Sequence, residues 1–450
     1  MARRIALAAL VALVVGLPLH NIAMAGLWDL GVRGTALDAV AAWKEALLLA
    51  GLAAVAWGLR GARPTLARVD LLALAYAAVV LVWAVLPQDW LGGEAHAKGV
   101  LYAVRHDLTP VAAYFLGRGL ALSGREVKRL AVLVGISAAA VAVWGLVDVY
   151  AVSLDWWRHS GAPGWFGEQL GLDYKTSLSG LPENFVYNPG NEEPVRRLVS
   201  TFLSPLATAY MLVVALLAAA AWPRARRLAL LAPLLAAGLL FTDSRSAIAA
   251  LAVGLVALAW AQRRWWPAVA AVAVLAGGAA FVKAFEHIGP ETRFTPAELV
   301  YLRENAARNP GASHDPLSAG ESSASSHLRN LRDGIETVLR HPQGYGPGNA
   351  GVTAFRTGVK LKAGESTYTE LGVEAGLLGA LLFVAWNVAL LRGVLAREPW
   401  IGASLAAVLV LGLQTDVIGV HWLAFVVWAL AGSTLPAWRS TPASTSATST

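Results

Sequence analysis

Three short polar groups each stand directly before a run of apolar residues, and their side chains are of types that bind anions or move protons. Arg196-Arg197 precedes one run, the stretch from Asp243 to Arg245 precedes a second, and Glu365 precedes a third. If each run is a helix, each group lies at a helix N-terminus, where free N–H groups and about half a positive charge favour anions. Arginine adds a planar fork that suits phosphate oxygens. Three such helix starts, brought together, predict an anion pocket with a carboxylate beside it.

Each of these residues also has an ordinary structural interpretation. Arg245 can pair with Asp243 at the edge of its apolar run. Arg196 and Arg197 can be solvated charges that nearby glutamates neutralise. Glu365 can be a simple acidic residue at the first turn of a helix, where carboxylates are common. The residues alone leave both interpretations open.

The elements that must position these groups are strongly apolar. The chain has 450 residues, of which 57% are hydrophobic and 14% charged, and its mean hydropathy is +0.55. A soluble chain would carry about 25% charged residues. Runs of about 20 apolar residues recur, the length of helix that crosses about 30 Å of hydrocarbon. We therefore predict an all-α polytopic membrane protein with about twelve transmembrane helices. They lie roughly at 5–25, 39–59, 69–87, 99–121, 128–150, 201–221, 227–242, 244–262, 265–285, 367–391, 401–418 and 420–436.

The basic charge of the chain fits a membrane protein better than a nucleic-acid-binding one. The net charge is +7, but Lys and Arg concentrate in the short connections between predicted spans. With Arg3-Arg4 in the cytoplasm, every short basic connection falls on the cytoplasmic side, and so do both chain ends. Membrane lipid is thus the expected surroundings, and nucleic acid is not an expected partner. The chain has 0 Cys, which excludes thiol catalysis, disulfides and Cys-ligated metals. No ligand cluster predicts a metal, and no cofactor is expected.

The chain is predicted to form a single membrane domain, 1–450. Two long segments fall outside the membrane on this topology, 151–200 and 286–366, and the Ser/Thr-rich tail 440–450 is expected to be disordered.

The second outer segment has helical spacing at 295–309 and 326–340. Ser325 and Ser326 are the candidate N-caps of the latter helix, and His341-Pro342 ends it. One apolar face is expected on that helix. It comprises Leu328, Leu331, Ile335, Val338 and Leu339.

Further charged residues interrupt the predicted spans, where charges are usually functional or paired, but the sequence assigns them no role. They are Lys44, Glu45, Arg105, His106, Asp107, Asp148 and Asp416. Arg105, His106 and Asp107 interrupt the predicted span 99–121 and are expected to mark its buried face. Arg356, with its neighbours Lys360 and Lys362, is more easily interpreted as part of a solvated face, and the alternative is that the three steer an anionic lipid headgroup.

Four short elements resemble those of the O-antigen polymerase and ligase superfamily. They are Arg197-x-x-Ser-Thr-Phe-Leu-Ser-Pro205, Thr242-Asp-Ser-Arg-Ser-Ala247, Pro342-Gln-Gly-Tyr-Gly-Pro-Gly348 and Glu365-Ser-Thr-Tyr-x-Glu-Leu-x-x-Glu-x-Gly-Leu-Leu-Gly379. Any one of them is weak by itself. All four occur in the order of the family, on the outer side of the predicted topology, so together they make a specific match.

The resemblance implies a GT-C-like glycosyltransferase in the bacterial inner membrane, with its active site on the periplasmic face. Such enzymes take a glycan carried on undecaprenyl pyrophosphate and transfer it, with inversion and without a metal, to a hydroxyl of a glycan acceptor. By position, Arg197 and Arg245, with Arg196 beside them, would hold the pyrophosphate. His341, directly before the third element, and Tyr368, inside the fourth, are further candidates for substrate binding.

The chain departs from the ligases at one position, because they carry a His where this sequence has Glu365. The departure favours a polymerase that joins repeat units of O-antigen or exopolysaccharide over a ligase that transfers glycan to lipid A-core. Glu365 is then the predicted general base, since a carboxylate can take the proton of an attacking hydroxyl. A transporter of lipid-linked glycans is the alternative from another class. It would be expected to show repeats and polar sites near the midplane of the membrane.

Overall fold

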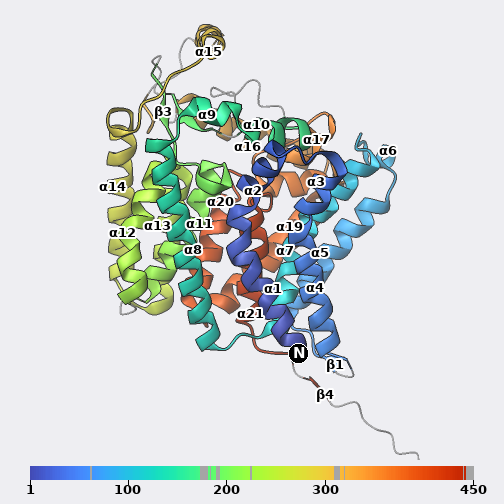
Figure 1. Cartoon of the computed structure of the whole chain (residues 1–450). Coiled ribbons are helices and arrows are strands. Elements are labelled where there is room, and N and C mark those ends of the chain that lie inside the picture. The colour runs from blue at the N-terminus through green and yellow to red at the C-terminus, as the bar shows by residue number, and fades with distance from the viewer. Residues whose placement is uncertain are drawn as a thin grey trace, which may run out of the picture.

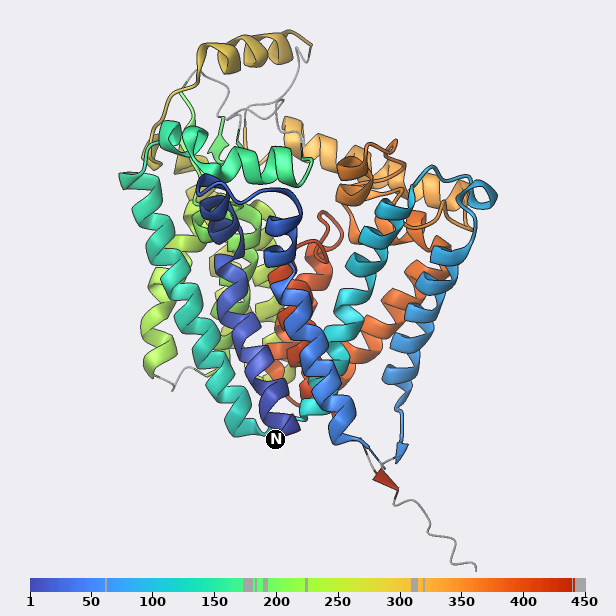
Figure 2. The ribbon, with the colours of Figure 1, turned by 45° about the vertical axis from the view of Figure 1, so that its right-hand side comes forward.

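A computed structural model describes residues 1–60, 63–172, 181–182, 184–188, 193–222, 226–308, 315–318, 320–438 and 440–441. Long helices run side by side and form one bundle (Figure 1). The N-terminus and strand β4 (Ser440–Thr441) lie at the same end of the bundle, which we call the terminal end. The opposite end carries α9 (Leu154–His159), α15 (Pro296–Arg308) and α16 (Ser322–Arg340), and we call it the loop end (Figures 1 and 2).

Among the described residues, six helical segments are long and apolar enough to cross a membrane, and a bent pair makes a possible seventh. The six are Ala2–Asp29 (α1 Ala2–Gly16, η1 Leu17–Leu19 and α2 His20–Asp29), α5 (Arg68–Val85), α8 (Gly124–Ala151), α13 (Arg245–Gln262), α14 (Trp266–Ile288) and α19 (Gly376–Leu395). The bent pair is α3 (Gly34–Ala41) with α4 (Trp43–Gly58). The structure therefore agrees with the prediction of an all-α membrane protein.

Five further helical segments coincide with predicted spans but are short or charged. They are α7 (Ala97–Leu120), α11 (Pro205–Ala221), α12 (Arg226–Phe241), α20 (Pro399–Leu411), and η4 (Leu423–Val427) with α21 (Trp428–Ser433). Four of them have fewer residues than the roughly 20 that cross the hydrocarbon, and α7 carries charges along its length. Twelve spans and a GT-C arrangement thus stay predictions, although every predicted span overlaps a helix.

The prediction of one continuous span over 367–391 was wrong. Helix α18 (Thr367–Glu374) ends at Glu374, and Gly376, the first residue of α19, has φ +69°. That left-handed conformation is easily adopted only by glycine. A Cβ at this position would lie 2.7 Å from the carbonyl oxygen of Gln343, so the close approach of another segment also requires glycine.

The N-cap prediction for 326–340 was also wrong, because α16 begins one turn earlier. Glu321 is its N-cap, and the carboxylate accepts the backbone N–H of Ala324 at 2.9 Å. The remaining short elements lie mostly in the connections at the two ends. They are α6 (Gln88–Leu91), α10 (Gly161–Pro163), η2 (Gly164–Gln169), η3 (Ser200–Phe202), α17 (Gly351–Thr357) and strands β1 (Arg63–Pro64), β2 (Val186–Tyr187) and β3 (Val195–Arg196). Antiparallel pairs join β1 to β4, within the predicted tail, and β2 to β3. Tail residues 442–450 lie outside the described residues.

Helix α7 is fixed in the middle of the bundle by close packing against α21. A Cβ on Gly117 would lie 1.9 Å from the carbonyl oxygen of Ala429, and one on Gly432 would lie 2.3 Å from that of Tyr114. Small residues let two helix backbones approach in this way. The polar residues that α7 carries farther along therefore sit on a rigid support.

Candidate active site

A cavity of about 500 Å³ lies among α7, α17, the segment before α18 and the connection from α20 to η4. Its lining combines carboxylates, arginines and histidines with large aromatic rings. The charged and histidine side chains are those of His20, Glu45, Arg105, His106, Arg356, Glu365, Glu370, Asp416 and His421. The aromatic ones are those of Tyr102, Phe166, Phe202, Phe355 and Trp422. Hydroxyl-rich and charged ligands both suit such a mixed lining.

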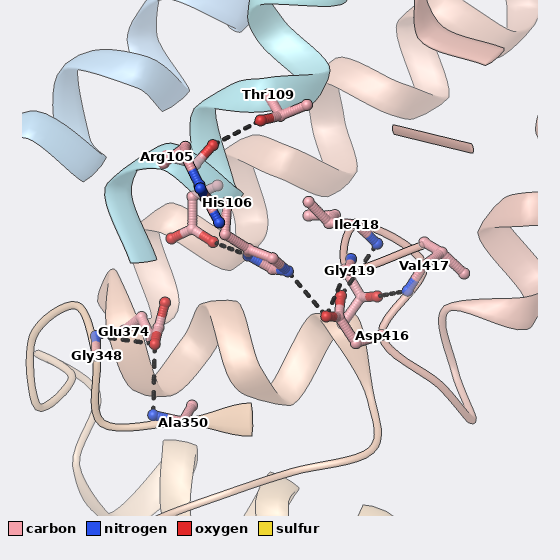
Figure 3. A network of polar contacts seen from close by, with 12 residues as sticks. Arg105, His106, Thr109, Gly348, Ala350, Glu374, Asp416, Val417, Ile418 and Gly419 are labelled. Atoms are coloured by element: carbon pink, nitrogen blue, oxygen red, sulfur yellow. Dashed lines mark hydrogen bonds and ion pairs between the residues drawn. The ribbon is translucent and has the colours of Figure 1, made fainter. Parts of the chain in front are cut away.

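One wall of the cavity is a buried network around His106 (Figure 3). Its Nδ1 lies 2.8 Å from a carboxylate oxygen of Asp107, and its Nε2 lies 2.8 Å from one of Asp416. Asp416 also accepts the backbone N–H groups of Ile418 and Gly419, each at 3.0 Å. An imidazole between two carboxylates donates from both nitrogens, as an imidazolium does. The ring thus bridges α7 and the connection that follows α20.

The third and fourth sequence elements of the resemblance are bonded to each other. Glu374 accepts the backbone N–H of Gly348 at 2.9 Å and that of Ala350 at 3.4 Å (Figure 3). The N–H of Tyr345 donates to the carbonyl oxygen of Val373 at 2.6 Å. Gly348 has φ +91°, so the glycine allows the turn that aims its amide at the carboxylate. This docking fixes the position of α18 and of the residues that lead into it.

Glu365 leads into α18 and lies between α16 and the cavity. Its side chain is 43% exposed and lines the cavity, while one carboxylate oxygen lies 2.6 Å from Nδ1 of His327 on α16. The hydrogen bond from His327 holds the pKa of Glu365 below its usual value against the effect of burial, and Asn330 adds to the lowering. Glu365 has φ +71°, a strained conformation for a residue with a side chain. Such strain clusters at functional sites.

The two arginines predicted to bind pyrophosphate lie where α12 ends and α13 begins. Arg197 donates to the backbone carbonyl oxygens of Thr242 and Asp243, at 2.9 and 3.3 Å. Arg245 donates to the carboxylate of Glu321 at 2.9 Å rather than pairing with Asp243. Burial raises the pKa of Asp243 to about 6, although Arg197 and Arg245 oppose that shift.

Helix α16 connects these groups. Its N-cap Glu321 holds Arg245, and His327, six residues later, holds Glu365. Six residues of α-helix rise about 9 Å. Arg245, at the start of the eighth predicted span, and Glu365, before the tenth, are therefore both bound to one short stretch of α16.

Arg196 has partners of its own. It is 2% exposed, and its guanidinium donates to Asp148 at 3.2 Å and to the carbonyl oxygen of Val152 at 3.0 Å. The interpretation of Arg196 as a solvated loop charge was therefore wrong. Its hydrogen bonds instead tie β3 to the C-terminal end of α8.

His341 and Tyr368 contact neighbouring helices. Nε2 of His341 lies 2.8 Å from the carbonyl oxygen of Leu91 in α6, and the ring stacks on Tyr345. The hydroxyl of Tyr368 donates to the carbonyl oxygen of Leu409 in α20 at 2.6 Å. Among the described residues that line the cavity, Glu365 is the one predicted site residue.

The sequence interpretation did not assign the rest of the lining. Arg105, His106 and Asp416 were noted only as charges that interrupt apolar runs, and Arg356 as a solvated residue. Charge inside a predicted span was the signal that could have found the first three. Over the part of the chain that the structure describes, no group of three or more His, Asp or Glu side chains is arranged to hold a metal ion.

Comparison with known proteins finds one family that matches part of the chain. Residues 230–384 match the family described as O-antigen ligase, and this segment contains Arg245, His327 and Glu365. No curated protein matches the chain. The family match and the apolar helices support a membrane-bound enzyme of the ligase and polymerase kind. The match over residues 230–384 supports the resemblance of this chain to the O-antigen polymerase and ligase superfamily.

Proposed function

We propose that this protein is a glycosyltransferase that polymerises repeat units of an O-antigen or exopolysaccharide. Its donor would be a glycan linked to undecaprenyl pyrophosphate, and its acceptor a sugar hydroxyl of another glycan. The observation that carries the proposal is the placement of Glu365. Its carboxylate is held at 2.6 Å by His327 and lines a cavity of about 500 Å³, at the position where the related ligases carry a His.

In the proposed reaction Glu365 is the general base. The acceptor hydroxyl lies in the cavity, and its oxygen attacks the anomeric carbon on the face opposite the pyrophosphate. As that bond forms, the proton passes to Glu365, the bond from carbon to the phosphate oxygen breaks, and undecaprenyl pyrophosphate leaves with the electron pair. His327 engages one carboxylate oxygen, so the other can take the proton. General-base catalysis of this kind contributes typically 10²–10⁴-fold.

Arg245 and Arg197 would bind the leaving pyrophosphate. Arg245 is 33% exposed, and a diphosphate would compete with Glu321 for its guanidinium fork. Charge-assisted hydrogen bonds contribute about 1.5–3 kcal/mol each. Pyrophosphate is a good leaving group, so stabilising its charge and positioning the hydroxyl suffice without a metal ion.

Arg196, His341 and Tyr368 stay predicted substrate contacts. Each has bonds within the chain that substrate would first have to replace. The mechanism above therefore does not depend on them.

The proposed location is the bacterial inner membrane, with the loop end in the periplasm and both chain ends in the cytoplasm. Two observations support it: the N-terminus and strand β4 lie at the terminal end, and the short basic connections fall on the side predicted for the chain ends. A single Cys introduced by Ser323→Cys into this Cys-free chain should react with an impermeant maleimide added to intact spheroplasts. Reaction only after the cytoplasm is opened would overturn this topology.

The decisive experiment supplies purified protein in lipid vesicles with a repeat unit linked to undecaprenyl pyrophosphate. A ladder of products with release of undecaprenyl pyrophosphate supports the polymerase. A single product on added lipid A-core identifies a ligase instead. Movement of the lipid-linked glycan across the vesicle without any product identifies the transporter.

A further inference from the structure

Helix α16 divides into three faces, and the first packs on α18. Gly334 and Val338 are buried on this face. A Cβ on Gly334 would lie 2.8 Å from Cβ of Thr369, and one on Gly372 would lie 2.6 Å from a methyl of Val338. The prediction of one apolar face on this helix was therefore confirmed only in part. Of the five apolar residues predicted for that face, Val338 is the one that is buried against α18.

The second face is an exposed apolar stripe. Leu328, Ile335 and Leu339 are 61%, 47% and 65% exposed. At about 100° of rotation per residue they fall within an arc of roughly 40°. Three large aliphatic side chains on one face of the helix are thus largely exposed in the described part of the protein.

The third face, beyond the stripe, is charged and exposed. It comprises Arg329, Asp333, Glu336 and Arg340. Going around the helix, the order is protein contact, apolar stripe, charged face. A helix at the edge of a membrane-embedded bundle needs this order, with the stripe turned to lipid and the charges turned to water.

The position of α16 agrees with this order. The helix lies across the loop end instead of running along the bundle (Figure 2). Just beyond its C-terminus, the carbonyl oxygen of Gln343 accepts a hydrogen bond from the indole of Trp83 at 2.7 Å. Trp83 belongs to the last turn of α5, whose final residue Val85 is 81% exposed. The end of α16 is therefore level with the end of a lipid-facing helix, where Trp residues mark the membrane interface.

We propose that α16 is an interfacial helix whose apolar stripe inserts into the outer-leaflet lipid of the membrane. A second copy of the chain is a poorer occupant, because three side chains cannot supply the roughly 800 Å² per partner of a stable interface. Since α16 carries both Glu321 and His327, lipid contact would hold in place the helix that binds Arg245 and Glu365. The lipid contact itself does not depend on the proposed function.

Site-directed spin labelling tests the insertion directly, because the chain has 0 Cys. A nitroxide is attached to Leu328→Cys, Ile335→Cys and Leu339→Cys, with Asp333→Cys and Glu336→Cys as matched exposed controls on the charged face. The proteins are reconstituted in vesicles of phosphatidylethanolamine and phosphatidylglycerol. The three stripe positions should be several-fold more accessible to oxygen, relative to a water-soluble nickel chelate, than the two controls. Their depth should be about 5–10 Å below the headgroups.

Equal access of the nickel chelate to all five positions would overturn the proposal. Dipolar broadening between labels on different copies would also overturn it, because it would mean that a second chain covers the stripe. A transferase assay of Leu339→Ser and Glu336→Ser in the same vesicles adds the functional consequence, with a loss expected for the first variant only. If wild type makes no product but the spin labels are buried in lipid, the proposed function fails and the interfacial helix stands.

Discussion

Helix α7 carries one buried charge cluster near its C-terminal end and another near its middle, and the two clusters differ in how completely their polar groups are hydrogen-bonded. Toward the terminal end, Arg118 donates to both carboxylate oxygens of Asp70, at 2.8 and 3.0 Å. Tyr114 and Trp438 also donate to that carboxylate, at 2.6 and 3.1 Å. The side chains of Arg118 and Asp70 are 2% and 0% exposed, and neither lines the cavity.

The cluster toward the loop end has more carboxylates than close cationic partners. His106 bridges Asp107 and Asp416, while the buried Glu370 lies on the same cavity wall and Glu374 just behind it. One oxygen of Asp107 is buried without a hydrogen-bond partner among the described residues. A paired cluster in tight packing has no group left for a ligand, whereas incompletely satisfied polar groups beside a cavity are typical of a site.

The sharpest test of this comparison is Glu365→Gln, which keeps size and shape but removes the basic oxygen. We expect turnover of lipid-linked repeat units to fall about 10²–10⁴-fold. Donor binding and thermal stability should change little. The matched control is Glu94→Gln, an exposed carboxylate whose partner Lys362 lies 2.9 Å away, and it should keep its turnover. Normal turnover in Glu365→Gln, together with loss in Glu370→Gln, would move the base to the deeper carboxylate.

At the terminal end the expected loss is in stability. Asp70→Ala leaves the Arg118 charge buried without its partner, which costs about 3–5 kcal/mol. Activity per folded molecule should be unchanged. Arg3→Ala, which removes an exposed ion pair at the same end, 2.7 Å from Glu126, should cost under about 1 kcal/mol. Denaturation in detergent measures the stability of wild type, Asp70→Ala and Arg3→Ala. A stable Asp70→Ala protein with impaired turnover would contradict this assignment, because it would mean that the terminal-end cluster serves activity and not stability.

Arg245→Ala should slow turnover by at least about 10-fold while the protein stays folded, because a charge-assisted contact to the leaving group is lost. Arg245→Lys should recover only part of the rate, since an ammonium cannot bind two phosphate oxygens as a fork does. Glu321→Gln separates the two possible roles of Arg245. If it slows turnover as much as Arg245→Ala does, the arginine acts only by holding α16.

The smallest expected effect is a pH-dependent difference in stability between wild type and His327→Ala. The folded-state pKa of Glu365 is lowered, first by the hydrogen bond from His327, so the contact stabilises the protein where the carboxylate is ionised. The stabilisation should be present above about pH 4.5 and should be lost as pH falls through the lowered pKa. For so exposed a pair it amounts to under about 1 kcal/mol. Melting curves from pH 3 to 6 that never converge at low pH would contradict this account.

Hydropathy could predict the helices, because each needs only an apolar run of sufficient length. It could not predict the break before Gly376, which depends on the approach of Gln343 from another segment. Nor could it predict that the apolar residues of α16 would separate into a buried and an exposed set. That separation depends on where α18 lies.

The sequence predicted Glu365 as a residue of the candidate site but did not predict the residues around it. The types and spacing of residues identified Glu365 and Arg245, whereas their partners His327 and Glu321 come from a different helix, 38 and 76 residues away. The partner of Arg196 is likewise distant, because Asp148 lies 48 residues earlier in the chain. Local patterns cannot reveal contacts that only tertiary packing creates.

The last contacts of the terminal-end cluster have a consequence for biosynthesis. The guanidinium of Arg118 donates to the carbonyl oxygen of Pro436 at 2.7 Å, across 318 residues, and Trp438 completes the shell around Asp70. At roughly 5–20 residues per second, the ribosome needs roughly 15–60 s to make the intervening chain. Until then the two charges that the folded bundle buries, Asp70 and Arg118, lack their partners from the C-terminal segment. A nascent chain that stops early never supplies them, so this cluster distinguishes finished molecules from truncated ones.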